Sequence, residues 1–305
     1  MREFYLDSKS GGKLLCRVWE PKGRPLATLQ IVHGIAEYGA RYADFAEFLT
    51  EHGILVAAED HMGHGGSISA EATQGFFVGG WETAVEDSGQ LLKWMRETYP
   101  EVPYFLLGHS MGSFMARTML FRFRFSGITG AIISGTGWQP APVLAAGLAI
   151  CKLEARRIGE KNTSPLVNKI MFGNYNKGIE PQRTAFDWLC TDDAVVDRYI
   201  ADPLCGFDAS VGLARDMLTG IRMIQQNSNI CRMTKDLPVL FIAGKSDPVG
   251  NYGKGVDQTV RAFRNMEMKN VTEILYEGRH EVLNEKNKAQ VYADVLKFME
   301  DLMLK

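Results

Sequence analysis

The sequence has few cysteines and no arrangement of them that indicates a metal or a disulfide framework. The 305 residues include five cysteines, which are widely scattered and contain no C-x-x-C pair: Cys16, Cys151, Cys190, Cys205 and Cys231. An odd, scattered set argues against both a zinc site and a network of disulfides. Reduced thiols in a cytoplasmic protein are the simplest interpretation.

Charge of one sign and long hydrophobic runs are also missing. The 34 Lys and Arg residues nearly balance 36 Asp and Glu, and the net charge is -2, so nucleic acid is not an expected partner. The longest apolar stretch, residues 130–151, is interrupted by Pro140 and Pro142 and does not predict a membrane span. The start, MREFYLDSKSGGKLL, has no apolar signal region, so secretion is not expected.

What the sequence does contain is an alternation of apolar runs and amphipathic stretches. Residues 2–8 and 13–21 predict antiparallel strands, and buried strands are predicted at 27–34, 54–60, 104–110, 130–135, 237–248 and 271–280. Helices are predicted at 41–52, 81–99, from 110 onward, at 252–265 and at 287–303. Nearly continuous apolar strands separated by helices predict an α/β fold with a mostly parallel sheet, covered by helices on both faces.

Residues 136–232 break this alternation. They contain no convincing strand and look helical, so we expect a helical cap inserted into a core of residues 1–135 and 233–305. The segment PAPVLAAGLAI, residues 140–150, is either an apolar helix at the mouth of an acyl tunnel or an ordinary buried helix of this cap.

The charges of the expected cap are uneven. Residues 151–183 hold seven Lys and Arg against three Glu, whereas residues 187–216 hold seven Asp against two Arg. The simpler interpretation is that these are two solvent-exposed faces whose opposite charges largely cancel. The alternative is a basic flank that transiently contacts the anionic head groups of a membrane surface.

Three residues that could form a catalytic triad each follow a predicted strand. Ser110 lies in GHSMG, Asp247 in GKSDPV and His280 in EGRHE. A serine hydroxyl needs a base to take its proton, and that base must be held in one orientation. Alone, each residue could be structural: a small residue in a tight turn, an Asp-Pro turn and a satisfied histidine. Together their order, Ser-Asp-His, is the one that this sheet topology uses.

A nucleophile of this kind also needs N–H donors for the oxyanion. We expect the backbone N–H of Met111, at the start of the helix after Ser110, and that of Ile35, in the loop after residues 27–34. Gly108 and Gly112 fit a sharp turn in which the helix passes close to the neighbouring strand.

Five motifs in order carry a family resemblance: HGIAE (33–37), DHMGHGGS (60–67), GHSMGS (108–113), GKSDPV and EGRHE. The chain resembles α/β-hydrolases of the monoacylglycerol lipase and lysophospholipase type, which are serine aminopeptidase S33-like. This resemblance implies a serine esterase or lipase without a cofactor or metal, with Ser110, Asp247 and His280 as triad. The closely spaced His61 and His64 invite a metal interpretation, but the resemblance implies that their loop is structural. His33 and His109 are likewise expected to be packing residues.

Three functions remain open at this stage. The first is a serine carboxylic ester hydrolase that cleaves a monoacylglycerol, lysophospholipid or other lipid-like ester through an acyl-enzyme on Ser110. The second keeps the triad but acts as an aminopeptidase or small-ester esterase, for which the amine-binding candidates are Asp187, Asp192, Asp193 and Asp197. The third, a binding protein without activity, is disfavoured because all three triad candidates are present.

Overall fold

The computed structural model describes residues 1–304, and an eight-stranded sheet of order β1-β2-β4-β3-β5-β6-β7-β8 runs through its centre. The strands are β1 (Arg2–Asp7), β2 (Lys13–Trp19), β3 (Ala27–Val32), β4 (Ile54–Glu59), β5 (Tyr104–His109), β6 (Ile128–Ser134), β7 (Val239–Gly244) and β8 (Val271–Tyr276). β1 pairs with β2 and β2 with β4 in antiparallel fashion, whereas β4, β3, β5, β6, β7 and β8 run parallel. The expected α/β fold with a mostly parallel sheet is confirmed.

Helices connect the parallel strands. They are α1 (Ala43–Glu51), α2 (Gly80–Thr98), α3 (Met111–Arg122), α4 (Ala141–Ile158), α5 (Pro165–Phe172), α6 (Asp193–Ala201), α7 (Val211–Ile224), α8 (Asn227–Ile230), α9 (Lys254–Asn265) and α10 (Lys288–Met303). Short 3₁₀ turns occur at η1 (Gly39–Tyr42), η2 (Gly65–Ser67) and η3 (Asp187–Leu189). The helices predicted around the sheet lie close to the positions that the apolar periodicity indicated.

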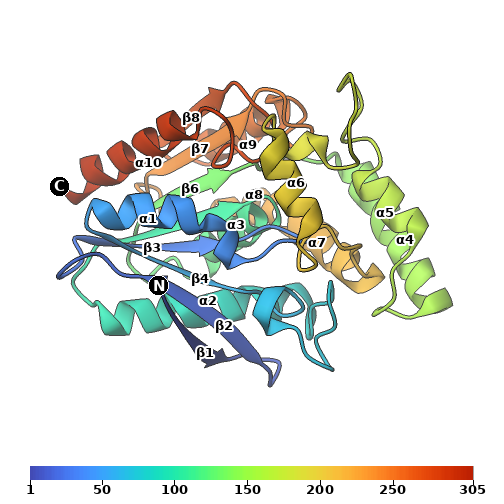
Figure 1. The fold of residues 1–305 in the computed structure, drawn as a ribbon, viewed down its shortest axis with the longest axis horizontal. Helices are drawn as coiled ribbons and strands as arrows, with labels where there is room; N and C mark the ends of the chain where they lie inside the picture. Colours follow the sequence, from blue (N-terminus) through green and yellow to red (C-terminus); the bar gives the residue numbers. More distant parts are fainter. Residues whose placement is uncertain (305) are drawn as a thin grey trace.

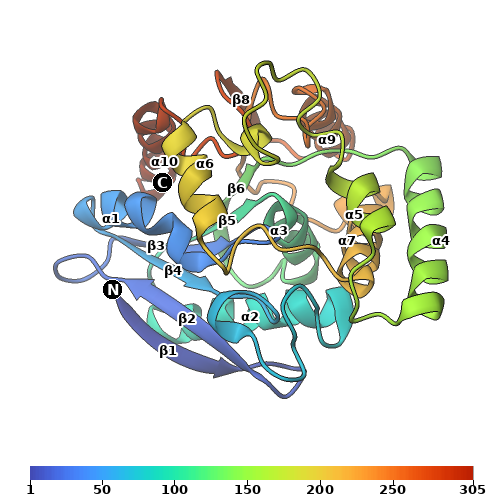
Figure 2. The ribbon, with the colours of Figure 1, turned by 45° about the vertical axis from the view of Figure 1, so that its right-hand side comes forward.

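The core consists of two apolar layers, one on each face of the sheet. β3, β4 and β5 are buried along their whole length, as expected for strands covered on both sides. On one face α1 and α10 contribute Phe45, Leu49, Val291 and Val295. On the other face lie α2, α3 and α9. Figures 1 and 2 show this sandwich of helices around the sheet.

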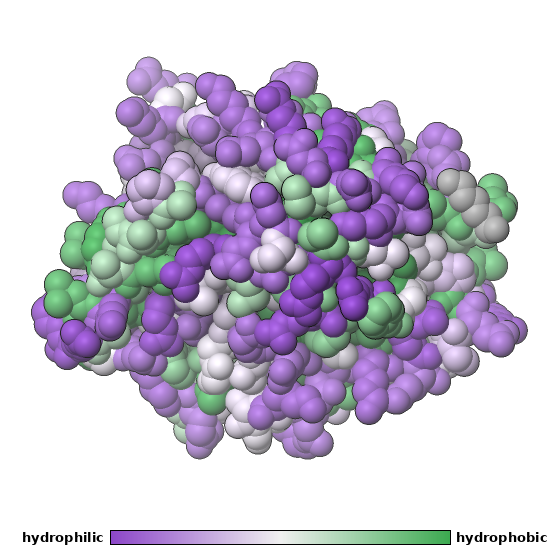
Figure 3. Space-filling model, turned by 180° about the vertical axis from the view of Figure 1, so that it is seen from behind, coloured by the Kyte–Doolittle hydropathy of each residue, from purple (hydrophilic) through white to green (hydrophobic). Residues whose placement is uncertain are grey.

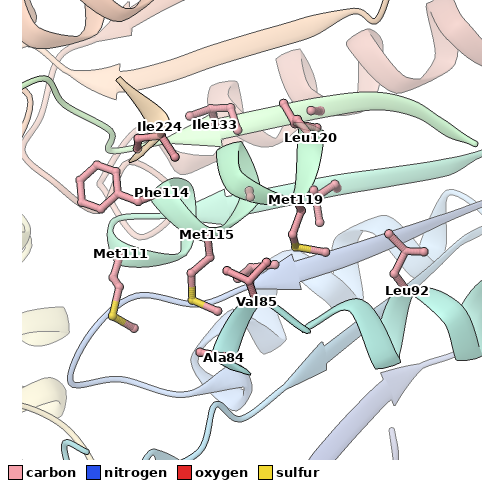
Figure 4. Packing of buried hydrophobic residues seen from close by; sticks show 14 of the residues in the cluster. Ala84, Val85, Leu92, Met111, Phe114, Met115, Met119, Leu120, Ile133 and Ile224 are labelled. Atoms are coloured by element: carbon pink, nitrogen blue, oxygen red, sulfur yellow. The ribbon is translucent and has the colours of Figure 1, made fainter. Parts of the chain in front are cut away.

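Helix α3 is held firmly in the second layer. Met111, Met115 and Met119 belong to one cluster with Val85 of α2 and Ile133 of β6 (Figure 4). The unbranched methionine side chains can fill the irregular space between the helix and its neighbours. Ser110, at the start of this helix, therefore has a rigid support.

The chain between β6 and β7 forms the helices α4 to α8, and among the described residues there it contains no strand, only one isolated bridge between Thr163 and Ser210. Figure 1 shows α4 to α7 beyond the arrowheads of β3 and β6. α7 packs on α2 and α3 as well as on α4. A β-carbon on Gly220 of α7 would lie 2.2 Å from the Trp81 ring, so this helix adjoins the core closely. Among the described residues, no helix is long and apolar enough to cross a membrane.

Candidate active site

The three predicted triad residues meet at the carboxyl edge of the sheet. Ser110 lies between β5 and α3, Asp247 follows β7 and His280 follows β8. The Nδ1 of His280 hydrogen-bonds Oδ2 of Asp247 at 2.9 Å, and the side chains of Ser110 and His280 line the same cavity. Ligands of open α/β sheets bind at this edge, so the location suits a catalytic centre.

Ser110 sits in a strained turn. Its φ of 53° and ψ of -123° are unusual for a residue with a side chain. Such a conformation costs on the order of 1–3 kcal/mol and persists only where its surroundings enforce it. The turn brings α3 against β3: a β-carbon on Gly112 would lie 2.0 Å from the carbonyl oxygen of Val32. One on Gly108 would lie 2.3 Å from the carbonyl oxygen of Gly112. Only glycine fits at these two positions, as the sequence predicted.

Asp247 and His280 are both buried, and the carboxylate is held on two sides. Oδ1 of Asp247 accepts a hydrogen bond from the Val249 N–H at 2.8 Å, while Oδ2 faces the imidazole. Burial lowers the pKa of His280, but the Asp247 carboxylate and the nearby Glu281 and Glu37 outweigh it, so the pKa is raised above its usual value. When the neutral His280 ring carries its proton on Nδ1 and donates it in a hydrogen bond to Asp247, Nε2 is free to accept a second proton. Nε2 is buried and hydrogen-bonds no other described residue, Ser110 included.

The loop that follows β3 lies directly against the nucleophile. A β-carbon on Gly34 would lie 3.0 Å from Cβ of Ser110, and Ile35 lines the cavity beside it. Among the hydrogen bonds of residues 1–304, none is donated by the backbone N–H of Ile35 or of Met111. Both groups are therefore available for an oxyanion, although their role there remains a prediction.

A buried ion-pair cluster beside the site was not foreseen from the sequence. Arg41 donates to both carboxylate oxygens of Glu281 at 2.7 and 2.8 Å, and to Oε2 of Glu37 at 2.7 Å. Glu37 also accepts from the Gly34 N–H at 2.6 Å and from the Tyr42 hydroxyl at 2.8 Å. Burial raises the pKa of Glu281, but the Arg41 guanidinium outweighs it and holds that pKa at about 2. The only signal in the sequence was that Glu37 ends the motif HGIAE and Glu281 ends the motif EGRHE.

His33, His61 and His64 are buried and pack against one another. The rings of His33 and His61 lie 3.8 Å apart, and Nε2 of His33 accepts from the His61 N–H at 3.0 Å. Burial lowers the pKa values of His33 and His64, the latter to about 3, so both are neutral at pH 7. His109 bonds the Ser134 hydroxyl at 3.2 Å. Within residues 1–304 no group of three or more His, Cys, Asp or Glu side chains is arranged to hold a metal.

The cavity above Ser110 has a volume of about 620 Å³. Its walls come from the core loops around Ile35, Ser110 and His280 and from the inserted segment. The inserted segment contributes the aromatic residues Phe172, Phe186, Trp188 and Phe207 together with polar ones such as Lys169 and Gln182. α4 does not line it, so the apolar stretch at residues 140–150 is not at the mouth of this cavity. Nor is it an ordinary buried helix, because Val143 on one side is 55% exposed while Leu144 on the other packs into the core.

The aspartates considered for amine binding are engaged elsewhere. Asp187 accepts hydrogen bonds from the backbone of Arg183 and Thr184, and Asp193 and Asp197 pair with the Arg183 guanidinium. Asp192 caps α6 through the Ala194 N–H. None of these four carboxylates lines the cavity. Of the three that do, Glu37 and Glu281 are tied to Arg41, and Asp208 is exposed.

The sheet order, the strained serine turn and the Asp247–His280 pair define an α/β-hydrolase. The chain belongs to the family described as serine aminopeptidase, S33, whose sequence profile matches residues 23–287, and it is a hydrolase of the carboxylesterase type. It is 27% identical to monoglyceride lipase of Rattus norvegicus, over 92% of this chain and 83% of the relative. It is 28% identical to monoacylglycerol lipase of Mycolicibacterium smegmatis, over 93% and 92%. The structure of a thermostable carboxyl esterase from Bacillus coagulans, in complex with glycerol, superposes with a TM-score of 0.92 at 27% identity, over 99% and 98% of the two chains.

Proposed function

We propose that this hydrolase cleaves a lipid-like carboxylic ester, a monoacylglycerol or a lysophospholipid, through an acyl-enzyme on Ser110. The observation that carries the proposal is the Asp247–His280 hydrogen bond of 2.9 Å beside a serine that lines the same cavity as His280. This arrangement supplies a nucleophile, a base and a group that orients the base.

In the proposed reaction, Oγ of Ser110 attacks the ester carbonyl carbon while Nε2 of His280 takes the hydroxyl proton. The negative charge that develops on the carbonyl oxygen is stabilised by the N–H groups of Ile35 and Met111, each worth about 3 kcal/mol of barrier in such enzymes. Collapse of the tetrahedral intermediate breaks the bond to the alcohol, which leaves with the proton from His280. Water then repeats these steps on the acyl-enzyme and releases the fatty acid, while Asp247 stabilises the imidazolium in both halves.

The relatives and the cavity both support a lipid substrate. Two relatives are named for monoglycerides or monoacylglycerols, and the similar carboxyl esterase structure contains glycerol. The cavity of about 620 Å³ exceeds what a small ester needs. Its aromatic walls can bury an acyl chain, which contributes about 0.8 kcal/mol per CH₂ group. In this proposal residues 136–232 form the cap of a core made of residues 1–135 and 233–305.

The rate of hydrolysis should rise with acyl-chain length in a series of monoacylglycerols. Longer chains bury more apolar surface against Phe172 and Phe207, so kcat/KM is expected to increase until the cavity is filled. A lysophospholipid, a short aryl ester and an aminoacyl amide complete the series. Activity confined to the short ester or the amide would contradict the lipid assignment and favour the small-ester or aminopeptidase alternative.

We also propose that the inserted segment contacts anionic membrane surfaces. Leu153 of α4 and Leu166 and Ile170 of α5 are exposed, and Lys152 and Lys169 precede two of them in the sequence. Figure 3 shows apolar side chains gathered along the edge of the molecule that carries α4. Apolar side chains beside lysines suit a surface of anionic head groups.

Sedimentation with vesicles of phosphatidylglycerol and phosphatidylcholine tests this contact. Leu153→Ser with Leu166→Ser should reduce the bound fraction several-fold, because less apolar surface enters the interface. Leu26→Ser is the matched control, since Leu26 is 63% exposed, against 66% for Leu153, and lies outside the inserted segment. Equal binding of the wild type, the double variant and Leu26→Ser would show that this surface does not contact the membrane.

A further inference from the structure

Residues 187–206, here called the 187–206 segment, contact two loops of the candidate site: the loop that carries His280 and the loop that contains Ile35. On one side the backbone N–H of His280 donates to the Trp188 carbonyl at 3.3 Å, and that of Glu281 to the Leu189 carbonyl at 2.8 Å. The Arg279 guanidinium donates to the carbonyl of Asp187 at 2.7 Å. The loop that carries His280 is thus fixed by backbone atoms of the inserted segment.

On the other side, the same segment binds the loop that contains Ile35. The carbonyl oxygen of Ala36 accepts two hydrogen bonds, one from the Tyr199 hydroxyl at 2.9 Å and one from the Gly206 N–H at 3.0 Å. Ala36 has a φ of 55°, a conformation that an alanine adopts only when its surroundings enforce it. The two donors satisfy a carbonyl in this conformation.

The N–H of Ile35 lies between two anchors. Before it, the Gly34 N–H is held by Glu37 at 2.6 Å, and after it, the Ala36 carbonyl is held by Tyr199 and Gly206. Arg41 joins these anchors, because its guanidinium bonds Glu37 and lies 4.8 Å from the centre of the Tyr199 ring. Nδ1 of His33 also donates to the Gly34 carbonyl, which belongs to the same peptide group as the Ile35 N–H, at 2.7 Å. A three-residue segment held at these points presents the Ile35 N–H in one direction.

We infer that Tyr199 is a positioning residue for the oxyanion hole: it holds the Ala36 carbonyl so that the Ile35 N–H points at the reacting oxygen. The inserted segment then positions a catalytic group in addition to forming part of the cavity wall. This inference rests on the proposed ester hydrolysis at Ser110. Tyr199 also lines the cavity, but its hydroxyl is engaged with the Ala36 carbonyl, and the proposed role acts through that bond.

Tyr199→Phe removes only the hydroxyl and keeps the ring against Arg41. Losing one of the two bonds to the Ala36 carbonyl should loosen the Ile35 N–H and lower kcat about tenfold, less than the loss of a whole oxyanion donor. KM should stay within about twofold, because the Ile35 N–H that Tyr199 positions stabilises the oxyanion of the transition state more than the bound substrate. The loss should be the same for short-chain and long-chain esters.

A trifluoromethyl ketone provides a second readout, because its adduct with a serine carries an oxyanion. Its affinity should fall by the same factor as kcat/KM. Tyr38→Phe is the matched control: the Tyr38 hydroxyl also ties the core to the inserted segment, through Asp202 at 2.8 Å, but does not bond Ala36. Tyr38→Phe should have the same melting temperature as Tyr199→Phe. Its kcat should equal that of the wild type.

Two outcomes would overturn the inference while leaving the proposed function intact. One is a Tyr199→Phe enzyme with unchanged kcat and unchanged ketone affinity. The other is a KM that rises with the polarity of the alcohol at constant kcat, which would make Tyr199 a substrate contact. A wild-type protein that hydrolyses no ester would instead overturn the proposed function, and this inference with it.

Discussion

Replacement of Ser110 by alanine is expected to lower kcat on every ester that the wild type cleaves by about 10⁶-fold, the scale seen when a serine protease loses its nucleophile. The reason is chemical, since alanine offers no oxygen to form the acyl-enzyme. The fold should survive, because the Ser110 side chain forms no hydrogen bond with any described residue and its turn is held by Gly108, Gly112 and the packing of α3.

Ser126→Ala is the matched control for this variant. Ser126 lies just beyond the other end of α3, where its hydroxyl donates to the Phe123 carbonyl at 2.6 Å, far from His280 in the sequence and not among the cavity walls. Its rate should equal that of the wild type. A Ser110→Ala enzyme with substantial turnover, measured on folded protein of the same melting temperature, would show that another group attacks the ester.

Asp247→Asn is expected to lower kcat by about 10⁴-fold, since the asparagine amide can hold the imidazole in the wrong tautomer. The pH dependence should change as well. Burial lowers the pKa of His280 and the Asp247 charge raises it, so removing that charge lowers the pKa. Because His280 must be neutral to act as a base, the residual activity should extend to lower pH than that of the wild type.

Asp294→Asn is the corresponding control. Asp294 lies on α10, outside the cavity, and accepts a hydrogen bond from the Tyr276 hydroxyl at 2.9 Å. The Asp294→Asn variant should have the same kcat and the same pH profile as the wild type. If Asp247→Asn kept the full rate, or its acid limb stayed where it is in the wild type, a different carboxylate would have to orient His280.

The sequence predicted the sheet and indicated where a candidate site would lie, because both depend on local patterns. The run Tyr104–His109 is apolar and short, as a doubly covered strand must be, and the helix after it begins at Met111, directly after the serine. Ser110, Asp247 and His280 could be proposed as a triad because each lies within a few residues of the end of a predicted strand, and parallel strands end at one edge.

Contacts between distant segments could not be predicted in the same way. The bond from Tyr199 to Ala36 spans 163 residues, and Arg41 reaches Glu281 across 240. Neither partner carries a local pattern that identifies the other. The apolar stretch at residues 140–150 shows the same limit, because its composition suited both a helix at the mouth of an acyl tunnel and an ordinary buried helix, whereas α4 does not line the cavity and is exposed at Val143.

The most direct test of the account is the mass of the protein trapped with an activated long-chain alkyl phosphonate ester, followed by peptide mapping. The phosphonate should add once, its leaving group should depart, and the label should lie on the peptide that contains Ser110. The Ser110→Ala protein should remain unlabelled. A label on another residue, or none on a folded protein that hydrolyses esters, would contradict nucleophilic catalysis by Ser110.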